Sequence, residues 1–123
     1  MLKARYDEKW NAVIIDFEGE VHYSDAEKFY AGIENILPKH GKGFRLLTDF
    51  THLKQMDVSV QELIKKAMDL FNEKGVTQII RVVPTPDQDI GFNILSAFHY
   101  SKSVKFLILA SRAEAEERFC GNE

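Results

Sequence analysis

The sequence predicts an α/β domain in which helices pack against a mixed five-stranded sheet, in the order β-β-α-β-α-β-α-β-α. Short β-rich segments alternate with amphipathic segments of helix length, and three Ser-x-x-Glu boxes each precede one of those segments. The first two strands are joined too tightly for a crossover and should pair antiparallel, whereas strands separated by helices should be parallel. A chain of 123 residues has the length of one domain, so we expect a single domain over residues 1–123.

The N-terminal elements follow from alternation and capping. Residues 2–7 alternate apolar and charged side chains, which predicts a half-exposed edge strand, and the β-rich residues 12–17 predict its hairpin partner. A capping box formed by Ser24 and Glu27 predicts the start of the first helix, because each side chain can bond the other's backbone N–H. Pro38 should end that helix.

The middle of the chain predicts a central strand and a second helix. Residues 44–50 should form the strand, with Asp49 at its end, and residues 51–58 should connect it to the helix. The second box begins at Ser59, which we expect to be the N-cap. Gly75 lies where a helix commonly ends on a left-handed residue.

The C-terminal third predicts two further strand–helix pairs. Residues 76–83 form a continuous apolar run, typical of a strand covered on both faces, and Pro84 should stop it. A third helix should occupy residues 87–100, and residues 104–110 should form the last strand. The third capping box, at Ser111, should open a short and charged terminal helix.

Composition restricts the class of partner. The formal net charge of −3 gives no basic surface for phosphate backbones or anionic membranes, so we expect no nucleic-acid partner. No apolar run approaches membrane-spanning length, and the charged N-terminus does not have the pattern of a signal peptide. The single cysteine, Cys120, cannot form an internal disulfide, which favours a reducing compartment. We therefore expect a soluble cytoplasmic protein.

One local segment strengthens the fold prediction. Residues 46–59 resemble the corresponding segment of the STAS domain, the SpoIIAA-like family that includes the bacterial anti-sigma factor antagonists. In those antagonists a strand ends in Asp, and an Asp-Ser-Ser-Gly-Leu motif opens the next helix. Asp49 matches the strand-end Asp, Asp57 matches the motif Asp, and Ser59 falls on the serine that a partner kinase phosphorylates. The resemblance implies a SpoIIAA-like fold and a regulatory role with an anti-sigma factor-like kinase as partner.

The segment also departs from that motif. Val58 replaces the first Ser and Val60 replaces the Gly, and a β-branched residue obstructs the close backbone approach that Gly permits. Two interpretations of Ser59 therefore remain. As a phospho-acceptor it would place its phosphate at a helix N-terminus, where the dipole favours negative charge. As a plain N-cap with Glu three residues later it needs no further role, and this is the simpler interpretation.

Polar side chains collect at the predicted carboxyl ends of the parallel strands, where ligands bind in open α/β sheets. These are Asp49, Asp57, Thr85 and Ser111, which we treat as a candidate ligand or partner site. The sequence has no nucleophile–base spacing and no Gly-rich phosphate loop, so we expect no enzyme activity and no cofactor. The histidines also lack metal-ligand spacing, so we expect no metal site. They are His22, His40, His52 and His99.

The third predicted helix is apolar around more of its circumference than one sheet face can cover. Phe92, Leu95 and His99 lie nearly opposite its core-facing side chains. Another helix could cover this second face, or it could form a homodimer interface or line a groove for an apolar ligand.

Three functions remain in competition. We favour a non-enzymatic SpoIIAA-like regulatory module that acts through protein–protein interaction and is switched at Ser59. The second is a module that binds an apolar or lipid-like small ligand beside the third helix, which a large enclosed cavity would support. The third, and least favoured, is a small enzyme that uses the strand-end rim.

Overall fold

A computed structural model describes residues 1–37, 43–84 and 104–121. Its five-stranded sheet has the order β1-β2-β3-β4-β5, with β1 antiparallel to β2 and every other neighbouring pair parallel. The strands are β1 (Leu2–Asp7), β2 (Ala12–Val21), β3 (Phe44–Met56), β4 (Val76–Val82) and β5 (Lys105–Leu109), and the helices are α1 (Tyr23–Ile36), α2 (Val60–Glu73) and α4 (Arg112–Gly121). This mixed sheet with helices packed against it confirms the predicted fold class.

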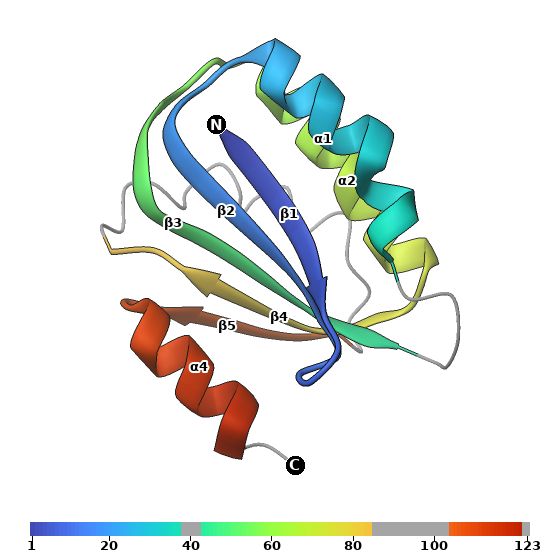
Figure 1. Cartoon of the computed structure of the whole chain (residues 1–123), viewed down its shortest axis with the longest axis vertical. Helices are drawn as coiled ribbons and strands as arrows, with labels where there is room; N and C mark the ends of the chain where they lie inside the picture. The colour runs from blue at the N-terminus through green and yellow to red at the C-terminus, as the bar shows by residue number, and fades with distance from the viewer. Residues whose placement is uncertain (38–42, 85–103, 122–123) are drawn as a thin grey trace.

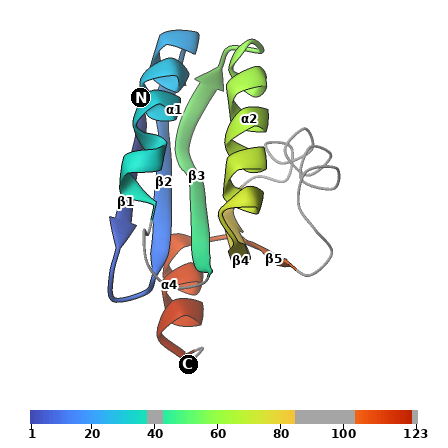
Figure 2. The same ribbon diagram turned by 90° about the vertical axis from the view of Figure 1, so that its right-hand side faces the viewer.

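The helices lie on both faces of the sheet. Helices α1 and α2 run side by side over one face, and α4 covers part of the other (Figures 1 and 2). The alternation along β2 accounts for this arrangement, because Val13 and Ile15 join the core under α1 and α2 while Ala12 and Ile14 join the smaller core under α4. None of the described helices has the length and apolar character that crossing a bilayer demands.

Strands β2 and β3 are longer than predicted. The four residues from Glu18 to Val21 continue β2 and pair in parallel with the segment from His52 to Met56, which we had predicted to be a connection. The pairing is interrupted by two register shifts, and Gly19 takes a positive φ of 61° beside one of them. The prediction that Asp49 ends its strand was therefore wrong, although Asp49 is the last residue of β3 that pairs with β4.

The start of α1 also differs from the prediction. The N-cap is His22, in extended conformation, and the Asp25 carboxylate accepts a hydrogen bond from the His22 backbone N–H at 2.8 Å. Ser24 lies inside the first turn, so the capping box predicted from Ser24 and Glu27 is wrong. The helix starts earlier because the acidic residue that reaches back to the N-cap is Asp25.

The remaining described elements confirm the sequence pattern closely. Helix α2 buries an apolar stripe, and Gly75 follows it with a φ of +94°. Strand β4 is buried along most of its length, and Val83 continues past it with its N–H bonded to the Leu109 carbonyl at 2.8 Å. The predicted third helix, residues 87–100, lies outside the described residues.

Candidate functional site

The structure separates the predicted rim residues into two groups. Asp49 faces α4 together with Ser111, whereas Asp57 lies at the far end of β3 beside the start of α1. Thr85 falls outside the described residues. Asp49 belongs to a set of contacts that we call the α4 ion cluster (Asp16, Asp49, Thr51 and Arg112). Asp57 belongs to a second set that we call the apical site (Glu20, His22, Asp57, Val58 and Ser59).

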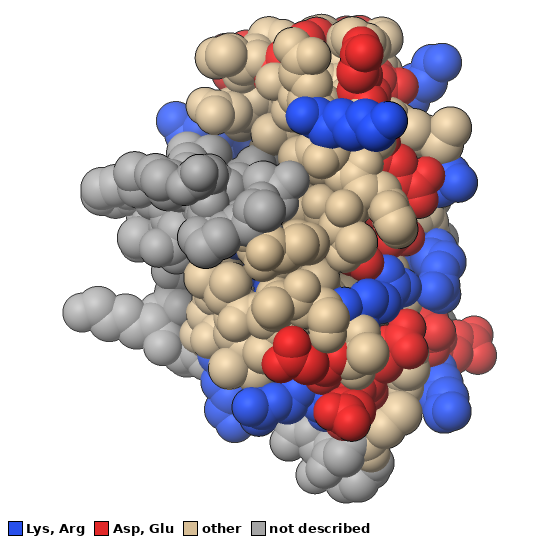
Figure 3. Space-filling view, turned by 90° about the vertical axis from the view of Figure 1, so that its left-hand side faces the viewer, with Lys and Arg blue, Asp and Glu red and all other residues tan. Residues whose placement is uncertain are grey.

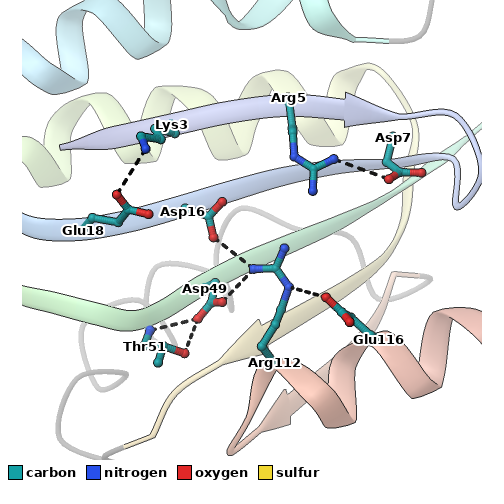
Figure 4. Close-up of polar contacts among 9 residues, drawn as sticks. All are labelled: Lys3, Arg5, Asp7, Asp16, Glu18, Asp49, Thr51, Arg112 and Glu116. Carbon is teal, nitrogen blue, oxygen red and sulfur yellow. Dashed lines mark hydrogen bonds and ion pairs between the residues drawn. The ribbon is translucent and has the colours of Figure 1, made fainter.

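The α4 ion cluster ties the terminal helix to the sheet. Arg112 Nη1 donates to Asp16 Oδ1 at 3.0 Å and to Asp49 Oδ2 at 2.8 Å (Figure 4). The other Asp49 oxygen accepts from the Thr51 backbone N–H at 2.9 Å and from the Thr51 hydroxyl. Asp16 and Asp49 are register partners on β2 and β3, so the sheet brings two carboxylates together, and one guanidinium bonds both of them.

These contacts fix the charge state of Asp49. Burial by itself would raise the pKa of the carboxyl, but hydrogen bonds from Thr51 and Arg112 outweigh burial and hold the pKa below its ordinary value. Both oxygens already accept hydrogen bonds, so the carboxylate is poorly suited to take part in proton transfer. The cluster has the properties of a structural ion pair.

Ser111 has a structural role as well. The Glu114 backbone N–H donates to Ser111 Oγ at 3.2 Å, and the Ser111 hydroxyl donates to the Glu114 carboxylate at 3.3 Å. The first of these bonds is the cap predicted from the third Ser-x-x-Glu box, whereas the Glu114 carboxylate bonds the Ser111 hydroxyl where the box has it bond the backbone N–H. The α4 side of the predicted rim is therefore occupied by contacts that hold the helix in place.

The apical site forms where two parallel strands end and two helices begin, at the top of Figures 1 and 2. Val21 of β2 pairs with Met56 of β3, and the Val21 carbonyl accepts the Asp57 backbone N–H at 3.0 Å. Because of this pairing, the β3–α2 connection lies beside the N-terminus of α1. The extension of β2 and β3 beyond the predicted strand ends is therefore what builds the site.

His22 links the elements of the apical site. Its Nδ1 lies 3.1 Å from Asp57 Oδ2, and its Nε2 lies 3.4 Å from Glu20 Oε1. The hydrogen bond with Asp57 raises the pKa of the imidazole above its ordinary value, and the negative charges of Asp57 and Glu20 add to that effect. The ring is exposed, so water screens these interactions.

Val58 and Ser59 form the outermost part of this site. Val58 is 81% exposed, the highest value among the exposed large apolar residues in the described part of the chain. Ser59 occupies the N-cap position of α2, as predicted, but its side chain makes no capping hydrogen bond. Its backbone is helical rather than extended, and the Glu62 N–H bonds the Ser59 carbonyl instead, at 3.4 Å. The capping box predicted from Ser59 and Glu62 is therefore wrong, and the hydroxyl is left exposed.

Most of the exposed large apolar side chains in the described residues lie at the end of the molecule that carries the apical site. Among the described residues, the exposed large apolar side chains are Met1, Tyr23, Val58 and Ile108. Tyr23 directly follows His22, and the Met1 amino group donates to the Glu20 carbonyl at 2.7 Å. Three of these four residues thus lie at the apical end, and Ile108 lies on the edge strand β5.

The charged surface has no region of one sign on the face drawn in Figure 3. Lys and Arg side chains alternate with Asp and Glu over the right-hand and lower parts of the coloured surface. Such interleaving does not create the extended positive field that attracts a phosphate backbone. Within residues 1–37, 43–84 and 104–121, no group of three or more His, Cys, Asp and Glu could hold a metal ion.

The other sequence candidates do not join either group. His52 lies in β3 opposite Glu18, and Cys120 is exposed in α4. His40 lies outside the described residues, as do the three residues of the predicted interface: Phe92, Leu95 and His99.

Two hollows lie between the sheet and its helices: a larger and more open one of about 290 Å³ between β1 and α1, and a more enclosed one under α1 and α2. The enclosed cavity is small. The enclosed cavity is lined mainly by apolar residues, among them Phe17, Phe29 and Met68, and its volume is about 30 Å³. Such a volume has room for about one or two water molecules, since a water needs about 10–15 Å³ of such space. It is too small for a lipid chain, so this cavity does not favour the apolar-ligand function.

The two basic side chains of these groups, Arg112 and His22, were not among the predicted site residues, and neither were Asp16, Glu20 and Thr51. Arg112 was missed as the partner of Asp49, although Asp in two neighbouring apolar strands is a signal that a cation is needed. From the sequence we treat His22 only as a histidine without metal-ligand spacing, and the Asp three residues later is the signal that it caps α1.

Comparisons with known proteins identify the fold. No family model and no curated protein matches the sequence. An uncharacterised protein of the DUF3478 family from Shewanella loihica PV-4, with a SpoIIAA-like fold, is 14% identical with a TM-score of 0.71, over 98% of this chain and 93% of that one. The anti-sigma factor antagonist SpoIIAA in its unphosphorylated form is 17% identical with a TM-score of 0.67, over 98% of this chain and 99% of that one. The Bacillus cell fate determinant SpoIIAA in its phosphorylated form is 18% identical with a TM-score of 0.61, over 96% and 98%. The chain therefore has a SpoIIAA-like fold.

Proposed function

We propose that this chain is a non-enzymatic regulatory module that docks a protein partner through the apical site, and that phosphorylation of Ser59 controls the docking. The observation that carries the proposal is the exposure of Val58 and Ser59 on a braced turn. Val58 leaves 81% of its surface in water, and the neighbouring hydroxyl has no capping role. Val58 shares this end of the molecule with two other exposed apolar side chains, Met1 and Tyr23, and grouped exposed apolar surface is typical of a binding site.

Three backbone hydrogen bonds support the rigidity of that turn. The N–H groups of Val60 and Gln61 bond the carbonyls of Asp57 and Val58, at 3.0 and 3.1 Å, and the Asp57 N–H bonds Val21 at 3.0 Å. A turn that is already ordered loses less conformational entropy when it binds than a mobile loop does. Val58 is therefore exposed on a turn that is already ordered before a partner binds.

Phosphorylation would change this surface strongly. A phosphate on Ser59 would add about 1.5–2 negative charges beside Val58, at a helix N-terminus that favours them. The added charge would have to lose its water when a partner covers Val58, so docking should weaken. Two of the similar solved structures are an unphosphorylated and a phosphorylated form of SpoIIAA, so this fold carries phosphorylation in another protein. By this analogy the partner would be a cytoplasmic kinase similar to an anti-sigma factor.

Site-specific crosslinking in cells of the native host tests the docking surface. A photoreactive amino acid at position 58 should capture one partner reproducibly. The same amino acid at position 108, another exposed apolar position, is the matched control and should not capture that partner. Equal capture from both positions, or no capture from position 58, would contradict the proposal.

Self-association stays a separate prediction from the sequence. The predicted third helix carries Phe92, Leu95 and His99 on a second apolar face. We expect a homodimer that Leu95→Glu splits without unfolding the subunit, as measured by sedimentation at matched concentrations. A monomeric wild type would contradict this prediction.

A further inference from the structure

The His22 ring lies between two carboxylates that belong to different parts of the chain. Glu20 comes from β2, and Asp57 comes from the β3–α2 connection. The two ring nitrogens face one carboxylate each, Nδ1 at 3.1 Å from Asp57 and Nε2 at 3.4 Å from Glu20. One ring therefore bridges the end of β2 and the segment that presents Val58 and Ser59.

The chemistry of imidazole makes this bridge depend on the proton. An imidazolium donates from both nitrogens, whereas a neutral imidazole donates from one and accepts at the other. A carboxylate only accepts. The arrangement with a carboxylate at each nitrogen is therefore satisfied by the protonated ring, and a neutral ring must give up one of the two contacts.

Two other charged groups lie near His22. The Asp25 carboxylate of α1 bonds the His22 backbone N–H at 2.8 Å, and its negative charge favours the protonated ring. The Met1 amino group bonds the Glu20 carbonyl at 2.7 Å and places a positive charge on the same side of β2. Three carboxylates thus surround the ring, from β2, α1 and the β3–α2 connection, and they raise its pKa, with Asp57 contributing most.

Asp57 connects the ring to the docking segment. Its N–H bonds the Val21 carbonyl at 3.0 Å, and its own carbonyl accepts the Val60 N–H at 3.0 Å. Val58 and Ser59 are the two residues inside that turn. A change in how tightly His22 binds the Asp57 side chain should therefore change the position of Val58 and Ser59, the residues that carry the proposed docking.

We propose that His22 is a positioning residue which, when protonated, clamps Asp57 and so fixes the arrangement of Val58 and Ser59, and that this clamp weakens when the ring loses its proton and with it its positive charge. The biological meaning of the clamp rests on the proposed docking function, but the clamp itself is a property of the isolated protein. Docking should consequently be tighter on the acidic side of the His22 titration than on the alkaline side. Both members of the pair are exposed, so the effect should be a modest fold-change.

NMR titration of the isolated, uniformly labelled protein tests the clamp. In wild type, the backbone amides of Val58 and Ser59 should shift with pH in step with the His22 ring. In His22→Gln that titration should disappear, and in His22→Arg, which keeps a positive charge at all pH values, it should disappear as well. In Asp57→Asn the pKa of the His22 ring should fall below its wild-type value. The amide spectrum of α4 serves as the check that each variant is folded.

Three outcomes would overturn the clamp. The amides of Val58 and Ser59 could fail to titrate with the ring in wild type, they could titrate unchanged in His22→Gln, or the His22 pKa could be unaffected by Asp57→Asn. None of these measurements involves a partner, so failure of the clamp is distinguishable from failure of docking at position 58.

Discussion

The α4 ion cluster and the apical site are built on the same plan but differ in exposure and in the permanence of their cation. In each, an Asp of β3 or its connection faces a basic side chain at the start of a helix: Asp49 faces Arg112, and Asp57 faces His22. The Asp49 side chain is 7% exposed and the Asp57 side chain 43%. Arg keeps its charge at all relevant pH values, whereas His loses it near neutrality. The first pair is therefore suited to holding a helix, and the second to a contact that can be released.

The largest difference that we expect between the two pairs is in their contribution to the free energy of unfolding. Arg112→Ala leaves Asp49 nearly buried without its cation, so we expect the free energy of unfolding to fall by about 2 kcal/mol, the usual cost of removing a hydrogen-bond partner from a charged group. His22→Ala should change the unfolding midpoint little, because the pair is exposed. Urea denaturation of both variants measures the difference. Glu117→Ala, an exposed change on α4, is the matched control. Equal losses in the two pair variants would contradict the comparison.

The two N-cap serines provide a second contrast. Ser111 accepts the Glu114 N–H, so Ser111→Ala should lower the free energy of unfolding by about 1 kcal/mol. Ser59 makes no capping bond, so Ser59→Ala should stay within about 0.5 kcal/mol of wild type. The same denaturation experiment compares the two. A larger loss from Ser59 than from Ser111 would mean that Ser59 caps α2 in solution.

The two pairs should also lose their contributions to folding stability when the pH changes in opposite directions. The Asp49 pKa is lowered by folding, so its contribution is present above the unfolded value of about 3.9 and is lost as pH falls through the folded value. The His22 pKa is raised, so its contribution is present below about 6.5 and is lost as pH rises through the folded value. Unfolding midpoints across pH for Asp49→Asn and His22→Gln measure both. If His22→Gln, and not Asp49→Asn, removed the fall in the unfolding midpoint at low pH, the assignment of that fall to Asp49 would be wrong.

The smallest effect on stability should come from the residue with the largest proposed role in docking. Val58→Ser removes an apolar side chain that is mostly in water, so we expect a change within about 0.5 kcal/mol. Partner capture should nevertheless be lost, which we would measure by crosslinking from position 23, where the exposed Tyr23 begins α1 at the same end of the molecule. Retained capture with unchanged stability would remove Val58 from the docking surface.

The elements that the sequence predicted well are those in which local pattern and tertiary packing agree. The alternation in β1, the apolar stripe of α2 and the Ser111 cap all depend on neighbouring residues, and all appear in the structure. The extension of β2 and β3 was missed because residues 51–56 are largely polar and are held by pairing with a strand distant in sequence.

The candidate site was predictable only in part for the same reason. Asp57 follows the end of β3, as its choice as a strand-end residue requires, whereas Asp49 lies inside that strand. The sequence also could not distinguish the buried Asp from the exposed one. That distinction depends on Arg112, which lies far away in the chain and reaches Asp49 only after the sheet and α4 have assembled. The helical backbone at Ser59, which leaves its hydroxyl exposed, is likewise set by the turn that starts at Asp57.

The most direct test of the central claim is crosslinking from position 58 in the background of two Ser59 variants. Ser59→Ala cannot be phosphorylated, and Ser59→Asp carries a permanent charge while remaining a good N-cap residue. Both variants should unfold at nearly the wild-type midpoint, which is the check on folding. We expect capture of the partner to persist in Ser59→Ala and to be lost in Ser59→Asp. Equal capture in the two variants would contradict a docking surface controlled at Ser59.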